Sequence, residues 1–284
     1  DFLIKNKIKI IEKNNFKNIQ CLKNYLKKYP DSILLTTFCF FKINNQIIKL
    51  FKNKIFNYHL GKIPEQVGAS ATFWYTMTRQ KFTAITFHRI TDELDSGEVL
   101  YEKKFSMKDR NYSLSEFYEL VRKNEKIAIR QFLDMILDKK KLKIIKKFQK
   151  NKIYMPRLNT PIHGYIDWSW EAEDISSFSR VFDKPYLGAS TFLSKKKIYL
   201  RNVSDHRSKI KFHPFQYGII FNKDEKNIYV ACRKGFIKAK IFNKKGKIDL
   251  STIVLGSRLY TDQYHLDNAK KLRSAHTGNG IKLK

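Results

Sequence analysis

Long apolar segments are missing from this sequence. No run of about 18 uncharged apolar residues occurs, so we expect no membrane span. Cysteine is scarce, and the three residues Cys21, Cys39 and Cys232 lie far apart, without a partner at metal-ligand spacing. This pattern argues against a disulfide framework and indicates buried thiols in a reducing cytoplasm. Lysine and asparagine interrupt each apolar stretch near residue 1, so we also expect no signal peptide.

Acidic residues are few, with 26 Asp and Glu against 57 Lys and Arg, which gives a formal charge of +31. This charge predicts attraction to anions, and nucleic acid is one candidate partner. However, 45 of the cations are Lys and only 12 are Arg, whereas specific readers of nucleic acid rely on Arg. A Lys-, Asn- and Ile-rich chain is also the product of biased coding, which is the interpretation we favour.

The 284 residues suffice for one large domain or two ordinary ones, and 42% of them are apolar, enough for a core. In the first half we predict helices at 19–28, 44–51, 71–77 and 113–137, and strands at 8–11, 33–35, 55–59, 82–90 and 99–105. Helices that alternate with buried strands are typical of a Rossmann-like, mostly parallel sheet. We assign residues 1–145 to this α/β domain.

The pattern changes after a Lys-rich linker at 139–152. A helix is expected near 172–182, followed by short β segments at 190–193, 198–203, 217–221, 228–232 and 236–242. Several short strands at this spacing, punctuated by glycine, are typical of a small β-barrel. We therefore assign residues 146–284 to a β domain.

One group of polar residues carries the chemistry. Asn57 and His59 end an apolar run and share one face of a strand, because strand side chains alternate with a period of two. Asp95 lies in the turn Asp95-Ser96-Gly97. A carboxamide can donate to a developing oxyanion, an imidazole can relay a proton and a carboxylate can accept one, and these steps move an acyl group onto an amine. Alone, an Asn-x-His pair is also explained as a hydrogen-bonded pair at a strand end.

Together with neighbouring motifs, this group resembles the 10-formyltetrahydrofolate-dependent formyltransferase family, which includes methionyl-tRNA formyltransferase and the sugar N-formyltransferases. The motifs lie between residues 20 and 105 in the family's order: Asn57-Tyr58-His59, Gly68-Ala69-Ser70, Ile85-Thr86-Phe87-His88 and Leu94-Asp95-Ser96-Gly97. The stretch from Tyr165 to Phe192 is similar to the start of the family's C-terminal domain. The resemblance implies that this second domain is an OB-like barrel.

The resemblance also implies a role for each residue. Asn57 would hold the formyl oxygen as negative charge develops, and His59 would stabilise that charge and relay a proton. Asp95 would orient His59 and accept the proton that the attacking amine loses. The formyl donor would be 10-formyltetrahydrofolate, with no metal. Its folate would lie against two segments, represented by Phe41, Lys42, Ile43, Asp92 and Leu94.

Two departures from the family pattern bear on the function. No glycine precedes Gly61 and little sequence precedes Asn57, so we expect the first βα units to be shortened or absent. The loop from Leu60 to Gly68 lacks the Arg-rich sequence expected of a methionyl-tRNA formyltransferase. We therefore predict a cytoplasmic enzyme whose acceptor is a small-molecule amine, first of all a nucleotide-linked amino sugar. Charged initiator tRNA is the alternative acceptor, and a catalytically degenerate basic binding protein is the further alternative. His88 is expected to line the cleft wall rather than to catalyse.

Overall fold

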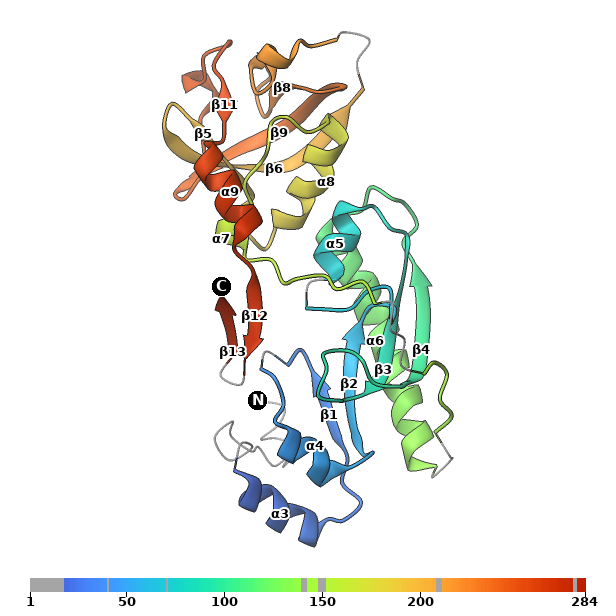
Figure 1. Cartoon of the computed structure of the whole chain (residues 1–284). Coiled ribbons are helices and arrows are strands. Elements are labelled where there is room, and N and C mark those ends of the chain that lie inside the picture. Colours follow the sequence, from blue (N-terminus) through green and yellow to red (C-terminus); the bar gives the residue numbers. More distant parts are fainter. Residues whose placement is uncertain are drawn as a thin grey trace.

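A computed structural model describes residues 18–39, 41–69, 71–138, 142–147, 152–207, 211–277 and 280–284. The side chains of Ala71 and His276 lie outside this description, as does the strand expected at 8–11. Figure 1 shows an α/β half, a β-rich half, and a hairpin near the C-terminus that runs from the second half back beside the first.

The first half is built on a four-stranded sheet. Its strands have the order β1-β2-β3-β4, with the bounds Leu34–Thr37, Ile55–Leu60, Phe82–Arg89 and Val99–Ser106. β1 and β2 are parallel, as predicted, and Thr36 stands opposite Asn57. β2 and β3 are antiparallel, and Asn57 stands opposite His88. The central position of β2 therefore gives Asn57 a polar neighbour on each side.

Four helices of the described part of the chain surround this sheet: α3 (Ile19–Lys28), α4 (Asn45–Phe51), α5 (Ala71–Met77) and α6 (Leu114–Leu137). α6 begins at the predicted capping box, in which Ser113 and Glu116 bond each other's backbone. Its Phe132 stacks on Phe87 of β3, with ring centroids 4.1 Å apart. Because strand side chains alternate, this packing leaves the polar side chains of β2 and β3 on the face away from α6.

The expectation of a mostly parallel sheet is wrong for the described strands. One pairing is parallel and two are antiparallel. α5, between β2 and β3, has only 7 residues and packs through Phe73 on Phe182 of the second half. It is not the crossover helix of a parallel βαβ unit, β3 runs antiparallel to β2, and the half is a mixed α/β domain.

The second half combines a curved antiparallel sheet with helix α8 (Ala172–Phe182). The strand order is β11-β5-β6-β9-β8-β7, with β10 beside β9. The strands are β5 (Ala189–Leu193), β6 (Lys196–His206), β7 (Ile220–Lys223), β8 (Ile228–Cys232), β9 (Gly235–Asn243), β10 (Gly246–Lys247) and β11 (Leu259–Tyr260). Ile175 and Phe182 of α8 share one buried core with Leu200 and Ile241 of the sheet.

A complete OB-like barrel, as the resemblance implied, is not established. The described strands form a half-barrel (Figure 1). Its edge strands β7 and β11 have 4 and 2 residues, and an isolated bridge between Ile219 and Arg258 joins the two edges. Because the two edges meet at this bridge and do not pair as strands of one ladder, the coarser description, a curved antiparallel sheet, is the one that holds.

Three further elements are not anticipated by the sequence analysis. They are α7 (Thr160–His163), α9 (Gln263–Lys271) and an antiparallel hairpin of β12 (Ser274–Thr277) and β13 (Gly280–Leu283). The hairpin follows α9 directly and ends near the first half (Figure 1). It therefore connects the end of the second half to the α/β sheet.

The two halves also pack through α5 and α8. Phe73 of α5 meets Phe182 and Tyr186 edge-on, at centroid distances of 6.1 and 5.7 Å. Arg79, just after α5, pairs with Glu173 and with Asp174 of α8, the latter at 3.1 Å. The Arg79 side chain is 19% exposed, so the interface combines apolar packing with half-buried ion pairs.

The described residues bear on two expectations from the composition. No described helix is long and apolar enough to cross a membrane. All three cysteines are free thiols, but only Cys232 is buried, while Cys21 and Cys39 are half-buried. The expectation that all three are buried is therefore wrong for two of them.

Candidate active site

The carboxamide of Asn57 lies between its two neighbours in the sheet. The Thr36 hydroxyl donates to Asn57 Oδ1 at 2.8 Å, which directs Nδ2 the other way. Asn57 Nδ2 is 3.1 Å from His88 Nε2 and 3.4 Å from Asp95 Oδ1. The parallel register of β1 and β2 thus fixes which end of the amide points toward the histidine and the carboxylate.

The two histidines face the same carboxylate from different sides. His88 Nδ1 donates to the Arg89 carbonyl at 2.8 Å, so its Nε2 is free to accept from Asn57. His59 Nε2 donates to the Gln66 carbonyl at 2.5 Å, and its Nδ1 lies 3.6 Å from Asp95 Oδ2. These proton positions follow from the partners, because a carbonyl can only accept. Nδ1 is therefore the ring atom through which His59 can exchange a proton with Asp95.

Asp95 is the centre of this cluster and is only 8% exposed. Its φ of +48° places it in the left-handed region, which aspartate tolerates better than bulky residues. The Gly68 N–H donates to Oδ2 at 2.9 Å. Burial raises the pKa of the Asp95 carboxyl, but the charge of His59, the contact with His88 and the Gly68 N–H outweigh it. Together they hold that pKa well below its usual range, so Asp95 is ionised at neutral pH.

Gly97 explains how the turn brings Asp95 to this place. A Cβ at residue 97 would lie 1.8 Å from the Arg89 carbonyl oxygen. Only glycine permits such a close approach of the turn to the end of β3. The Asp-x-Gly spacing noticed in the sequence therefore has a steric cause.

The segment that joins the two halves, residues 152–159, completes the loop after His59. The Val67 N–H donates to the Ile153 carbonyl at 3.1 Å, and the Met155 N–H donates to the Val67 carbonyl at 2.6 Å. Gly68 has a φ of +111°, and a Cβ there would lie 2.2 Å from the Met155 carbonyl oxygen. The joining segment therefore holds the Gly68 N–H in position to bond Asp95.

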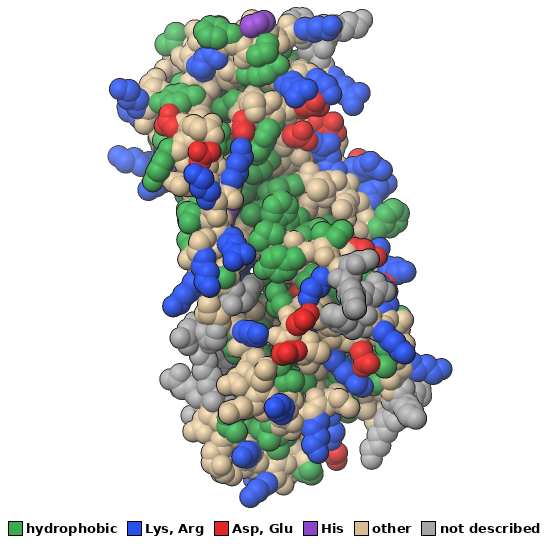
Figure 2. All heavy atoms as spheres, viewed as in Figure 1, with side chains coloured by type: hydrophobic (Ala, Val, Ile, Leu, Met, Phe, Trp, Pro, Cys, Tyr) green, Lys and Arg blue, Asp and Glu red, His purple; other side chains and the backbone are tan. Residues whose placement is uncertain are grey.

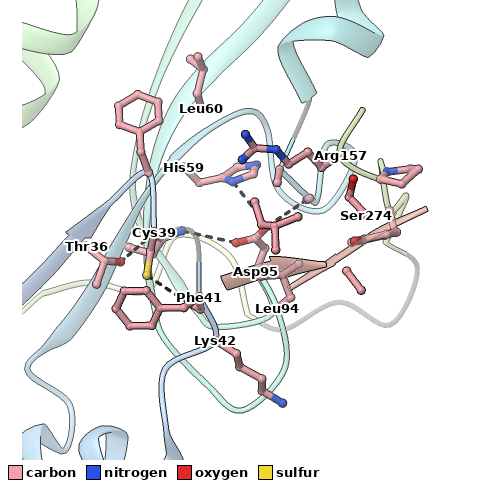
Figure 3. Close-up of a pocket in the computed structure, with 18 of the residues that line it drawn as sticks. Thr36, Cys39, Phe41, Lys42, His59, Leu60, Leu94, Asp95, Arg157 and Ser274 are labelled. Carbon is pink, nitrogen blue, oxygen red and sulfur yellow. Dashed lines mark hydrogen bonds and ion pairs between the residues drawn. The ribbon is translucent and has the colours of Figure 1, made fainter. Parts of the chain in front are cut away.

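These groups line a cavity of about 1240 Å³ that both halves of the chain enclose, called the cleft below. The three predicted catalytic residues line it together with His88. All five residues predicted to contact folate line it as well: Phe41, Lys42, Ile43, Asp92 and Leu94. Figure 3 shows Asp95 in the centre of the view, with His59 above it and Phe41 and Lys42 below. Among the described residues, no group of three or more His, Cys, Asp or Glu side chains could hold a metal ion.

Sequence reasoning missed three contributors to the cleft. One is Thr36, whose bond to Asn57 depends on the strand register. Another is the joining segment, represented in the cleft by Tyr154 and Arg157. The last is the hairpin, which contributes Ser274. Of these three, only the hairpin could have been predicted from the sequence, because Gly278-Asn279-Gly280 between two short segments is a typical turn sequence.

Family models match both halves of the chain. A model described as "Formyl transferase" matches residues 4–133, and one described as "Formyl transferase, C-terminal domain" matches residues 160–256. The chain belongs to the formyltransferase family. The part of this chain after residue 256, which includes α9 and the hairpin, lies outside both matches.

Two curated relatives differ in how much of their own length this formyltransferase-family chain covers. It is 26% identical over 278 residues to the bifunctional polymyxin resistance protein ArnA of Wigglesworthia glossinidia brevipalpis, a match to 95% of this chain but 41% of ArnA. It is 24% identical over 264 residues to the methionyl-tRNA formyltransferase of Acetivibrio thermocellus, a match to 91% of this chain and 82% of that enzyme. The chain thus spans less than half of ArnA.

Among solved structures, the fold is similar to that of WlaRD, a sugar 3N-formyl transferase determined in the presence of dTDP and 5-N-formyl-THF. The TM-score is 0.55 at 18% identity, over 86% of this chain and 81% of WlaRD. At this identity the similarity shows that the two share a fold.

Proposed function

We propose that the chain transfers a formyl group from 10-formyltetrahydrofolate to a primary amine. The observation that carries this proposal is the convergence of Asn57, His59, His88 and Asp95 in one cleft, around a buried carboxylate. A hydrogen-bond donor, an imidazole and an ionised base within reach of one another are what acyl transfer to an amine requires.

Each side chain has a role in this proposal. The amine nitrogen bonds to the formyl carbon, the bond from that carbon to N10 of the folate breaks, and N10 gains a proton. Asn57 Nδ2 donates to the formyl oxygen as negative charge develops, exchanging its long 3.4 Å contact with Asp95 for this bond. Asp95 accepts the proton that the amine loses, and His59 Nδ1, 3.6 Å away, stabilises the developing charge and relays the proton.

The cleft is suited to a folate donor and a second substrate together. Its volume of about 1240 Å³ exceeds the range of about 300–1,000 Å³ that is typical for one drug-sized ligand. Phe41, Ile43 and Leu94 give one part of it apolar walls, which suits the flat pteridine ring. The description of WlaRD, in the presence of 5-N-formyl-THF and dTDP, supports the same pairing of ligands.

For the acceptor, we favour a nucleotide-linked amino sugar. WlaRD is described as a sugar 3N-formyl transferase, and the loop from Leu60 to Gly68 lacks the Arg-rich sequence expected of a tRNA-specific enzyme. Charged initiator tRNA is the second candidate, because the chain matches 82% of a methionyl-tRNA formyltransferase. Mass spectrometry of products from a panel of amino-sugar nucleotides and charged initiator tRNA separates the two. Formylation of the tRNA alone would rule out the sugar.

The alternative hypothesis, that the chain is a catalytically degenerate binding protein, is tested with the variants Asn57→Ala, His59→Ala and Asp95→Asn. We expect each variant to lose at least about a hundredfold in kcat, the usual effect of removing an oxyanion donor or a general base. Activity unchanged in all three would show that the site is misassigned. A wild-type protein without activity that binds RNA with a steep salt dependence would favour the binding protein.

The proposal extends to the architecture. We assign residues 1–145 to the catalytic domain and residues 146–284 to a second domain whose half-barrel corresponds to an OB-like fold. Three unpaired thiols support a cytoplasmic site of action.

A further inference from the structure

The hairpin of β12 and β13 is fixed to the cleft at both of its ends. At its base, Arg273 and Lys284 exchange two backbone hydrogen bonds of 2.9 Å. At the other end, the Lys42 N–H donates to the Thr277 carbonyl at 3.1 Å. Ser274, at the start of β12, forms an isolated bridge with Arg157 of the joining segment. The hairpin is therefore held as a wall of the cleft, and Arg273 has a defined place at its base.

The rim formed by the joining segment and the hairpin is cationic. None of the described residues after 150 that line the cleft is acidic, whereas Lys152, Arg157 and Arg273 all line it. Lys152 pairs with Glu93 at 3.0 Å. Arg273 is exposed, and no described carboxylate lies within 4.0 Å of its guanidinium. Figure 2 shows basic side chains along the hairpin, beside the hydrophobic surface in the middle of the molecule.

Tyr154 connects this rim to the catalytic carboxylate. It lines the cleft and is 48% exposed. Burial raises the pKa of the Tyr154 hydroxyl, Asp95 raises it further, and Arg273 lowers it. The hydroxyl is thus within electrostatic reach of both residues. Arg273, Tyr154 and Asp95 all line the cleft, so one ligand bound there can contact all three.

Arg157 and Arg273 lie at the base of the hairpin, whereas its tip bonds Lys42 of the segment predicted to contact folate. In Figure 3, Arg157 lies near His59 at the top of the view, and Phe41 and Lys42 lie below Asp95. If folate occupies the Phe41 side, the rim with Arg157, Arg273 and Tyr154 is left for the acceptor. Guanidinium groups bind phosphate well, because their N–H groups can form two parallel hydrogen bonds with it.

We propose that Arg273, with Arg157 beside it, forms a subsite for a phosphate group of the acceptor, and that Tyr154 contacts the part of the acceptor between the phosphate and the amine. The inference rests on the proposed function, because that function defines the ligand as the acceptor substrate. Binding of a phosphate group at the subsite can nevertheless be measured without turnover. The phosphate belongs to a nucleoside diphosphate in a sugar acceptor and to the nucleic acid backbone in a tRNA acceptor.

The test is equilibrium binding with Arg273→Ala and with Lys271→Ala as the control. Lys271 is an exposed cation at the end of α9 that does not line the cleft. Calorimetry is run with UDP, dTDP, uncharged initiator tRNA and tetrahydrofolate. We expect Arg273→Ala to weaken the binding of a nucleoside diphosphate about tenfold, as for a lost charge-assisted contact. Tetrahydrofolate binding should not change, and Lys271→Ala should change neither.

Each outcome decides the inference. An Arg273-dependent affinity for tRNA, but not for the nucleoside diphosphates, supports the phosphate subsite and assigns it to a nucleic acid. Weaker binding of tetrahydrofolate in Arg273→Ala, or no phosphate ligand bound by the wild type, overturns it. Near-ultraviolet circular dichroism confirms that the variants are folded. If the phosphate subsite is found but no acceptor is formylated, the proposed function fails and the subsite stands. If formyl transfer occurs and Arg273→Ala does not affect it, the proposed function stands and the subsite is overturned.

Discussion

Replacement of Asp95 by asparagine tests the centre of the site. The substitution keeps the shape and an oxygen for the Gly68 N–H at 2.9 Å, but removes the charge that faces His59 at 3.6 Å and His88 at 3.5 Å. Asparagine cannot take the proton of the amine. We expect kcat to fall about 10²–10⁴-fold, the usual contribution of a general base, which equals about 3–5 kcal/mol of activation free energy.

The same substitution predicts a dependence of stability on pH. The pKa of Asp95 in the folded protein lies below its unfolded value, which is about 3.9. Its charge therefore stabilises the fold above about pH 4, and this contribution is lost as the pH falls further. A hydrogen-bonded charge of this kind contributes about 2 kcal/mol. The free energy of unfolding should thus differ between wild type and Asp95→Asn by about this amount at neutral pH, and the difference should shrink below about pH 4.

The assay measures formylated acceptor by mass spectrometry and unfolding in urea by circular dichroism. Glu119→Gln, an exposed carboxylate on α6, is the control and should change neither result. A folded Asp95→Asn protein with kcat within threefold of wild type would refute the role of base. A stability difference that persists unchanged at pH 3 would refute the low pKa.

Three further substitutions test how the cleft is held. Thr36→Val removes the donor that orients the catalytic carboxamide, and we expect kcat/KM to fall about fivefold, as for one hydrogen bond of about 1 kcal/mol; Thr37→Val, on the exposed face of β1, should have no effect. Gly68→Ala introduces a clash with the joining segment and should lower the thermal unfolding temperature and abolish activity. Gly246→Ala has a similar positive φ but open space around it, so a loss of equal size there would show that backbone strain alone is responsible. Arg79→Ala removes the ion pairs to Glu173 and Asp174. Because both carboxylates are largely exposed, we expect a loss of about 1 kcal/mol in the free energy of unfolding, measured in urea; an unchanged free energy of unfolding would contradict this.

The sequence predicts the parts of this site that depend on local periodicity. Asn57 and His59 share a face of β2 because strand side chains alternate, and the position of Asp95 follows from its turn and Gly97. The bond from Thr36 depends on which residue of β1 pairs with β2, and that register is set by packing between distant segments. The short strands of the second half could be predicted from the sequence, but the curvature of their sheet could not. Curvature depends on how edge strands meet, as at Ile219 and Arg258.

The pairing between the loop after His59 and the joining segment has a consequence for how the protein is made. Residues 153–155 leave the ribosome long after β2 and the Gly68 loop have emerged. A nascent chain that ends before these residues holds Asn57, His59 and Asp95 but lacks the backbone bonds that position the Gly68 N–H. The catalytic groups are therefore synthesised early, but the backbone bonds that position the Gly68 N–H against Asp95 form only when translation reaches the second half.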